Sequence, residues 1–338
     1  MKKETSAKNI LDILEMLKRL KEANYVIVAS PKAYAVDSIG SSLLIHELLS
    51  HKGMGILKPH TLFCAKKPRA SDNSLLEFVE TELDLFSTTI PHYTTPLCIV
   101  VVDHGSFKTC CLDPAIYQHI PHNFIGLDHH PESEDFPKNS IQIVDTNAAS
   151  TTAIIYKLLR FQLPITRTTA IYTALGIMAD IGGKLTHPKV NAETLQILVN
   201  CIKTDIPWEE IQEATKPKIP PTRMYVWMKA HKELNHLTQD AVSLVVYRRT
   251  LAEWAGSRKD IETFFGTIMC SLEYVNLAIL IFEQDDGSWR ISFRSRGPRK
   301  NLAAELAKVF GGGGHAHEAA AIYLGDPYRA EGMILSRL

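Results

Sequence analysis

The residues best suited to chemistry are Asp128, His129 and His130, which follow one another directly before Pro131. They offer one carboxylate and two imidazoles within three positions. Imidazole and carboxylate are the usual protein ligands of Mn²⁺, Fe²⁺ and Zn²⁺. The alternative for such a triplet standing alone is a surface turn with two solvated histidines. The triplet therefore needs partners elsewhere in the chain before it indicates a metal site.

Three further acids supply those partners. Asp103 ends the apolar run 98–102, Asp180 ends an apolar stretch of helical character, and Asp37 precedes the small residues at 38–41 that begin a helix. Each acid by itself is typical of a helix cap or a turn. Together with Asp128, four acids at strand and helix ends of one predicted sheet favour a shared site.

Short apolar strands alternating with helices must position these acids. We expect strands at 25–29, 98–102, 123–127 and 141–144, and helices at 38–50, 151–163, 166–179 and 190–203. This alternation predicts a mainly parallel sheet. In such sheets ligands bind outside the carboxyl ends of the strands, where Asp103 and Asp128 fall.

The sequence pattern changes between 204 and 224, where four prolines break the helical periodicity. Beyond this stretch we expect strands at 241–247, 276–282 and 289–293, a hairpin turn at 285–288, and a helix at 301–310 followed by four glycines. A chain of 338 residues has the length of two domains. We therefore predict domains at 1–203 and 225–338 joined by a linker at 204–224.

The composition indicates which binding partners and which cellular compartment to expect. Lys plus Arg equals Asp plus Glu, at 37 each, so no overall basic field favours long duplex nucleic acid. A local basic patch at 216–223 or 294–300 is compatible with this balance. The six cysteines have no CxxC spacing and are expected to be reduced thiols. We find no signal peptide and no apolar run long enough for a membrane span, so we expect a cytoplasmic protein without membrane contact.

The order of these motifs resembles the DHH superfamily. The catalytic-domain blocks are similar to Asp37-Ser-Ile-Gly-Ser41, Asp103, Asp128-His-His130, Ala148-Ala-Ser-Thr151 and Asp180. Phe310-Gly-Gly-Gly-Gly-His315 resembles a loop of the C-terminal DHHA1 domain, and Ser292-Phe-Arg-Ser295 resembles the strand before it. The resemblance covers nearly the whole chain. It implies an α/β protein with a mainly parallel DHH catalytic domain, a smaller mixed α/β DHHA1 domain, and a cleft between them.

The resemblance also implies roles for the acids and histidines. Members of the family hold two metal ions, usually Mn²⁺, and a pair about 4 Å apart can clamp an in-line displacement at phosphorus. The implied metal ligands are Asp37, His129 and Asp180 on one ion and Asp103 as the bridging carboxylate. Asp128 would orient its neighbours. His130 would face the substrate phosphate or help to protonate the leaving group.

The implied substrate-binding residues of the second domain are Arg294, Gly312, Gly313, Gly314 and His315. Glycines let backbone N–H groups approach a phosphate closely because no side chain intervenes. His315 adds a donor, and the guanidinium of Arg294 can grip a phosphate with its fork. The alternative for a glycine run standing alone is a flexible connector.

The first metal motif departs from the family pattern, which reads His-x-x-Pro-Asp-x-Asp. Counting back from Asp37, Pro31 stands at the His position and Ala35 at the first Asp position. Neither side chain binds a metal, so a second ion keeps only Asp103 and would be weakly held. We therefore expect one divalent ion, of Mn²⁺, and leave a second ion open.

Three explanations for this departure stay open. The site could use one metal, with a lysine such as Lys32 in place of the second cation. It could recruit an unusual ligand such as His104. Or the protein could bind a nucleotide without cleaving it. A second departure is Glu318, which stands where the family usually has a small residue.

We predict a metal-dependent phosphoesterase. By resemblance to the nanoRNase and pAp-phosphatase branch, the expected substrates are a short single-stranded oligonucleotide, a linear dinucleotide such as pApA, or a small nucleotide such as 3′-phosphoadenosine 5′-phosphate. The alternatives are a catalytically degenerate nucleotide-binding protein on the same fold and a polyphosphate hydrolase that uses the same site. Family members often dimerise through the catalytic domain, which leaves a homodimer open.

Overall fold

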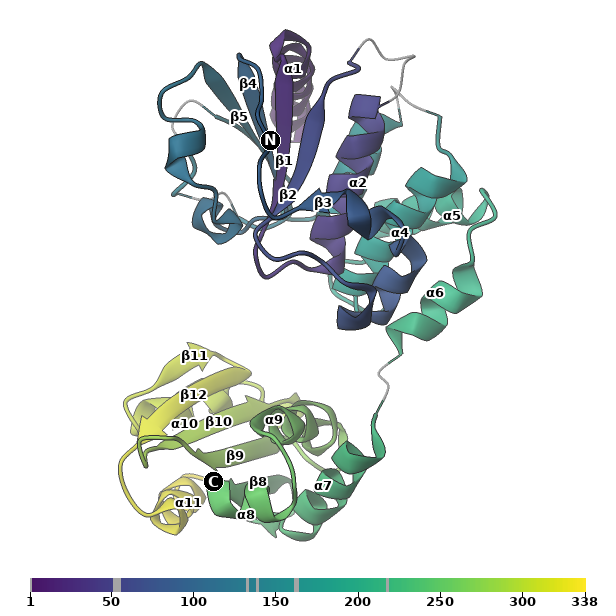
Figure 1. Cartoon of the computed structure of the whole chain (residues 1–338). Coiled ribbons are helices and arrows are strands. Elements are labelled where there is room, and N and C mark those ends of the chain that lie inside the picture. The colour runs from purple at the N-terminus through teal and green to yellow at the C-terminus, as the bar shows by residue number, and fades with distance from the viewer. Residues whose placement is uncertain (1, 51–55, 132–133, 138–139, 161–163, 217–218) are drawn as a thin grey trace. The chain divides into compact units, whose positions relative to one another are not determined.

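The chain folds into two compact units, residues 1–217 and 218–338, each with its own sheet (Figure 1). This computed structural model describes residues 2–50, 56–131, 134–137, 140–160, 164–216 and 219–338. The end of the helix expected at 151–163 and Pro217 of the expected linker lie outside the described residues. The cleft that the resemblance implies between the domains stays a prediction.

The sheet of the first unit is parallel throughout. Its six strands lie in the order β3-β2-β1-β4-β5-β6. They are β1 (Tyr25–Ser30), β2 (His60–Cys64), β3 (Phe86–Ser87), β4 (Leu97–Val102), β5 (His122–Asp128) and β6 (Ile141–Val144). Every neighbouring pair in this sheet is parallel, which confirms the predicted sheet type.

Both faces of this sheet are covered, because alternate residues of a strand point to opposite sides. Val26 and Val28 of β1 belong to a core formed with the helices, whereas Ile27 and Ala29 belong to a second core with side chains of the connecting segments. The helices are α1 (Lys2–Glu22), α2 (Val36–Ser50), α3 (Thr151–Leu159), α4 (Arg167–Asp180), α5 (Ala192–Ile202) and α6 (Trp208–Thr215). Short 3₁₀ turns are η2 (Ala70–Asp72), η3 (Ser74–Val79), η4 (Glu82–Leu85), η5 (Phe107–Cys110) and η6 (Pro114–Ile116).

The second unit holds a mixed sheet in the order β11-β12-β10-β9-β8-β7. Its strands are β7 (Asn235–His236), β8 (Ala241–Val246), β9 (Leu277–Glu283), β10 (Trp289–Ser295), β11 (Gly313–His315) and β12 (Glu318–Tyr323). Its helices are α7 (Pro221–Lys232), α8 (Arg248–Glu253), α9 (Arg258–Thr267), α10 (Leu302–Val309) and α11 (Pro327–Leu335), with 3₁₀ turns η7 (Met269–Ser271) and η8 (Gly297–Arg299). Only the β8–β9 pair is parallel among these strand pairs. The predicted hairpin joins β9 and β10, and part of the glycine run forms the edge strand β11.

The stretch predicted as a linker contains helices. Pro207 is the N-cap of α6, and Pro221 is the first residue of α7. Proline fits the first turn of a helix because its missing N–H has no partner there anyway. Ile211 of α6 is buried, and α6 packs against α4 and η3, so this part of the predicted linker belongs to the folded first unit. Pro207 and Pro221 mark the starts of helices and not an irregular segment.

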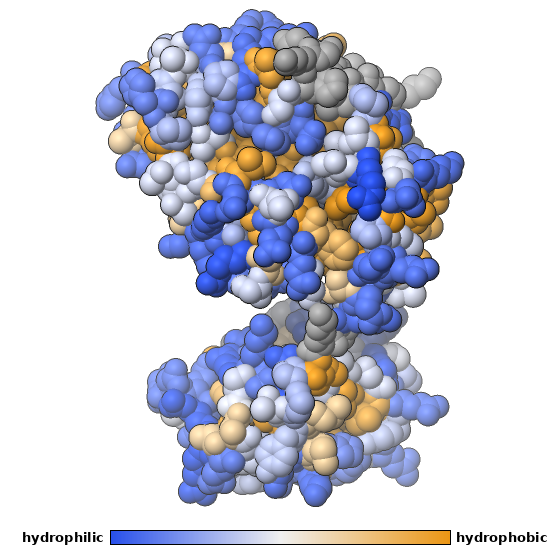
Figure 2. Space-filling view, turned by 45° about the vertical axis from the view of Figure 1, so that its right-hand side comes forward, coloured by the Kyte–Doolittle hydropathy of each residue, from blue (hydrophilic) through white to orange (hydrophobic). Residues whose placement is uncertain are grey.

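The surface of each unit carries mostly hydrophilic residues on the visible face, with hydrophobic side chains scattered among them (Figure 2). Such scattered exposure is ordinary, because polar atoms cannot cover a whole protein surface. In the described part of the chain, no helix combines the length and apolar character that a membrane crossing requires.

Candidate metal centre

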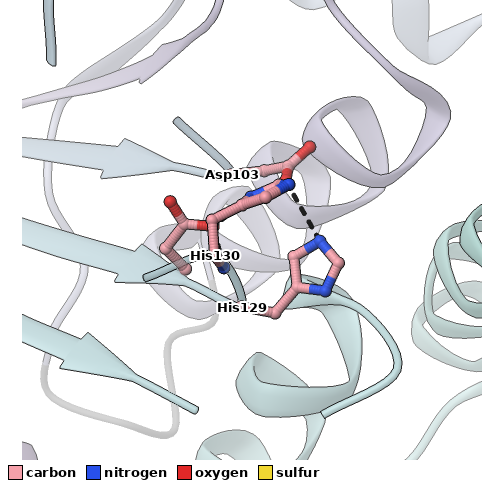
Figure 3. Close-up of side chains that lie close together, drawn as sticks. Asp103, His129 and His130 are labelled. Atoms are coloured by element: carbon pink, nitrogen blue, oxygen red, sulfur yellow. Dashed lines mark hydrogen bonds and ion pairs between the residues drawn. The ribbon is translucent and has the colours of Figure 1, made fainter. Parts of the chain in front are cut away.

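Asp103 and Asp128 meet because their strands are neighbours in register. Val102 of β4 pairs with Leu127 of β5, and the backbone N–H of Asp103 donates to the Leu127 carbonyl at 2.9 Å. Asp103 has a φ of 49°, in the left-handed region that few residues other than glycine adopt. Figure 3 shows its carboxylate beside the rings of His129 and His130. This unusual turn therefore brings the carboxylate to the two imidazoles.

Asp37 is fixed by the start of another helix. It lies in the first turn of α2 and is fully buried. Its carboxylate accepts hydrogen bonds from the backbone N–H groups of Thr151 at 2.7 Å and Thr152 at 2.9 Å. These are the first two residues of α3, whose N–H groups have no partner within the helix. The block at 148–151 thus has a physical role, which is to hold the Asp37 side chain.

His129 lies at the centre of the cluster. Its Nε2 is 3.2 Å from Oδ2 of Asp180, the last residue of α4, and 3.7 Å from Oδ1 of Asp103. Ligand atoms of Asp37, His129 and Asp180 all lie within 4.8 Å of one another, and the same holds for Asp103, Asp128, His129 and His130. The six residues that the sequence singled out in this unit are therefore brought together.

Buried carboxylates crowd one another in this cluster. Burial, reinforced by Asp37, Asp180 and Asp128, raises the pKa of Asp103 well above its usual range. Burial and then Asp37 raise the pKa of Asp180 to about 8. Oδ2 of Asp180 is buried and has no hydrogen-bond partner among the residues that the structure describes. A divalent cation would relieve this repulsion, and three carboxylates with one imidazole form a donor set that Mn²⁺ accepts. Asp37, Asp103, His129 and Asp180 could therefore hold one such ion.

Asp128 orients His130. Its Oδ1 accepts from the backbone N–H of His130 at 3.0 Å and lies 2.8 Å from His130 Nδ1. Its Oδ2 accepts from the backbone N–H of Gly105 at 2.8 Å. Burial alone would raise the pKa of Asp128, but these hydrogen bonds outweigh it and hold the pKa well below its usual range. The hydrogen bond to Asp128 in turn raises the pKa of His130, whose ring is half-exposed.

Neither His104, suggested as an unusual ligand, nor Lys32, suggested in place of the second cation, joins the cluster of ligand atoms. The His104 ring is fully buried against Phe136, with Nδ1 3.5 Å from Oδ2 of Asp128. Within the described part of the chain, neither ring nitrogen has a hydrogen-bond partner. Lys32 is exposed, and its backbone N–H donates to Thr109. Among the described residues, neither belongs to a group of converging metal ligands.

Sequence reasoning missed Lys189. This residue lies in the segment between α4 and α5, and its Nζ is 3.0 Å from Nδ1 of His129. A single lysine in a connecting segment carries no signal in the sequence. Its position beside the cluster depends on the tertiary fold of that segment.

In the second unit, four of the five predicted binding residues line one cavity. This cavity measures about 470 Å³ and is lined by Arg294, Gly313, Gly314 and His315, together with Arg290 and Ser292. Gly312 is not part of the lining. A Cβ at Gly312 would lie 2.2 Å from the Ala320 carbonyl, so glycine is needed there for β11 to approach β12.

Comparison with known proteins identifies the first unit. Residues 26–177 match the DHH family, N-terminal domain. Over these residues the first unit is similar to the DHH family, and the order of its acidic and histidine motifs is that of the same family. The chain is 26% identical over 208 residues to the bifunctional oligoribonuclease and PAP phosphatase NrnA of Bacillus subtilis, which covers 59% of this chain and 63% of that protein. It is 25% identical over 231 residues to an A-adding tRNA nucleotidyltransferase of Geobacter sulfurreducens, which covers 67% of this chain and 25% of that protein.

The chain thus matches less than two thirds of the length of either relative. A solved structure supports the fold over nearly all of its length. The exopolyphosphatase-related protein from Bacteroides fragilis superposes with a TM-score of 0.67 at 20% identity, covering 97% of this chain and 96% of that one. At this identity the likeness establishes the shared two-unit α/β architecture.

Proposed function

We propose that this protein is a metal-dependent phosphoesterase acting on short oligonucleotides, linear dinucleotides or a nucleotide phosphate such as pAp. The observation that carries the proposal is that Asp37, Asp103 and Asp180 all approach the buried ring of His129. The substrate class rests on the similarity to an oligoribonuclease and PAP phosphatase. The formal net charge of zero, with no excess of basic residues, fits a small substrate.

Those four residues would hold the divalent cation, which we expect to be Mn²⁺. When bound, the cation supplies Lewis acidity at a phosphoryl oxygen and lowers the pKa of water. His130 would hydrogen-bond the phosphate or donate a proton to the leaving oxygen, because Asp128 fixes the orientation of its ring. Arg294, Gly313, Gly314 and His315 would form a phosphate-binding site in the second unit, with Gly312 allowing β11 to approach β12.

A second candidate function is nucleotide binding without hydrolysis. Pro31 and Ala35 favour it, since they stand where the family has two ligands of the other metal. The cluster that remains argues for catalysis. Three acids gathered around one buried imidazole are costly to keep unless a cation or a reaction uses them.

The proposal is tested by hydrolysis of a labelled RNA dinucleotide and of pAp by the purified protein with Mn²⁺. We expect mononucleotide from the wild type and loss of at least 100-fold in rate for Asp103→Asn and His129→Ala. Asp84→Asn, which alters an exposed surface carboxylate, is the matched control and should keep full activity. EDTA should abolish the activity, and Mn²⁺ should restore it.

Two outcomes separate the candidates. Folded wild type that binds Mn²⁺ and AMP but releases no product from either substrate, or from a pyrophosphate or diester analogue, supports the binding protein. Full activity in both Asp103→Asn and His129→Ala would show that this cluster is not the catalytic site.

A further inference from the structure

Arg294 and Glu318 face each other across two strands of the second unit. Arg294 of β10 and Glu318 of β12 are directly opposed in the antiparallel register. Their side chains form an ion pair. Opposite charges at directly opposed positions stabilise a strand pair. The pairing of β10 with β12 therefore places these two side chains next to each other.

The pair stands where two cavities meet. The cavity of about 470 Å³ extends toward Gly313, Gly314 and His315. A second cavity, of about 290 Å³, is lined by residues that include Cys270, Asn276 and His317. The residues that line both cavities are Gly266, Arg294 and Glu318. The side chains of Arg294 and Glu318 are 35% and 51% exposed, so a ligand can reach them.

The neighbouring arginines do not duplicate Arg294. The guanidinium of Arg296 donates to the carbonyls of Val275 at 2.6 Å and of Leu272, which ties it to the protein backbone. Arg290 lines the larger cavity but not the smaller one. Arg294 is therefore the arginine that a ligand in either cavity would meet, and it is already paired with a carboxylate.

A carboxylate and a phosphate present the same feature to an arginine, which is two oxygens that accept from its planar fork. We propose that Glu318 is a resident competitor for Arg294, which a phosphate group must displace in order to bind. The observed affinity for the phosphate is then the intrinsic affinity multiplied by the fraction of molecules in which Arg294 is released from Glu318. This inference rests on the phosphate-binding part of the proposed function, and it concerns binding in the second unit, not hydrolysis.

The test measures AMP and adenosine binding by the full chain in EDTA, so no metal or catalysis enters the readout. Calorimetry gives the affinities, and the backbone amide NMR signals of Gly313 and Gly314 show whether the ligand reaches this cavity. Glu318→Gln keeps the shape of the side chain and removes its charge. We expect it to tighten AMP by about five- to tenfold and to leave adenosine unchanged.

Two further variants separate competition from a general change in charge. Asp285→Asn removes the partner of Arg248 in an exposed ion pair of 3.0 Å on the same unit, and it should leave AMP affinity unchanged. Arg294→Gln should weaken AMP, and adding Glu318→Gln to it should bring no further gain.

Three results would overturn the inference. Weaker binding of both ligands to Glu318→Gln would make Glu318 a direct ligand contact. Equal tightening of AMP by Asp285→Asn would reduce the effect to net charge. If AMP shifts the Gly313 and Gly314 signals in none of the variants, the second unit has no phosphate site here. That conclusion holds whatever the result of the hydrolysis assay.

Discussion

Lys189 donates a hydrogen bond to Nδ1 of His129, the ring nitrogen opposite to the one that faces the carboxylates. Its Nζ lies 3.0 Å from Nδ1 of His129, whereas Nε2 lies 3.2 Å from Oδ2 of Asp180. An ammonium group has three donors and no acceptor, so Nδ1 must accept. Metal-binding histidines usually donate their second N–H to a carboxylate or carbonyl. Here a cation stands in that position, and it opposes the binding of a second positive charge through the same ring.

Replacing Lys189 with Met should therefore strengthen metal binding. Removing one positive charge beside the ligand set should raise the affinity for Mn²⁺ by about tenfold, which corresponds to about 1.4 kcal/mol. Calorimetric titration of the substrate-free protein measures this directly. Lys184→Met, an exposed lysine of the same connecting segment, is the control and should change the affinity less than twofold. An unchanged affinity in Lys189→Met would mean that the lysine does not oppose the metal.

Asp128→Asn should impair turnover more than metal binding. Asn keeps the shape of the side chain but loses the charge that pairs with Nδ1 of His130 at 2.8 Å. Loss of such an orienting partner typically costs 10- to 100-fold in activity, and we expect about that loss in kcat. Metal content measured by mass spectrometry should stay close to that of the wild type.

The same variant should shift the pH profile in a defined direction. The hydrogen bond to Asp128 raises the pKa of His130, so removing the charge lowers that pKa. If protonated His130 assists the leaving group, the basic limb of the kcat profile moves to lower pH in Asp128→Asn. Asp145→Asn is the matched control, because Asp145 follows the adjacent strand β6 but pairs with Lys157. A profile that stays in place, with kcat reduced, would leave His130 without a role as a proton donor.

The positions of Asp103 and Asp128 at one edge of the sheet could be predicted from the sequence of each strand. The runs ending at Asp103 and Asp128 were recognisable as buried strands, and a parallel sheet places the ends of neighbouring strands at one edge. The positions of Asp37 and Asp180 could not be derived in this way. They meet because α2 packs against α4, a contact between segments more than 100 residues apart that only the family resemblance implied.

Other parts depended on tertiary context that the sequence does not display. Strand β12 is rich in alanine, which has low strand propensity, and it forms because β10 pairs with it along its whole length. The register of that pair sets Glu318 opposite Arg294. The linker prediction treated prolines as breaks, although Pro207 and Pro221 stand at helix starts.

Gly176→Ala should disturb the metal cluster through packing alone. A Cβ at Gly176 would lie 2.3 Å from Oγ1 of Thr152 and 2.4 Å from Oδ1 of Asp37. Because both neighbours are buried and hydrogen-bonded, one of them must move. We expect a loss of about 1–3 kcal/mol in stability and weaker Mn²⁺ binding. Gly332→Ala in α11 is the control, since nothing lies within 4 Å of its Cβ. Denaturant unfolding and metal titration measure both effects, and a fully stable variant with normal Mn²⁺ affinity would contradict the close contact.

Asp240→Asn should destabilise the second unit in a pH-dependent way. Arg299 donates to both carboxylate oxygens of Asp240, at 2.8 and 2.9 Å. This pairing, helped by Asn276 and Thr238, lowers the pKa of Asp240 to about 2. An unfolded aspartate titrates near pH 3.9, so the folded state binds the proton less tightly than the unfolded state. The stabilisation is therefore complete above about pH 5 and is lost as the pH falls toward 2.

At pH 7 we expect Asp240→Asn to cost about 1–2 kcal/mol, because the pair is partly exposed to water. The difference from wild type should narrow steadily between pH 5 and pH 3. Three of the four tryptophans, Trp227, Trp254 and Trp289, belong to the second unit, so fluorescence during urea unfolding reports mainly on it. Asp285→Asn, in an ion pair whose carboxylate side chain is 94% exposed, should have little effect at any pH. A loss that is equally large at pH 3 and pH 7 would mean that the Asp240 side chain stabilises this unit by its shape and hydrogen bonds, and not by its charge.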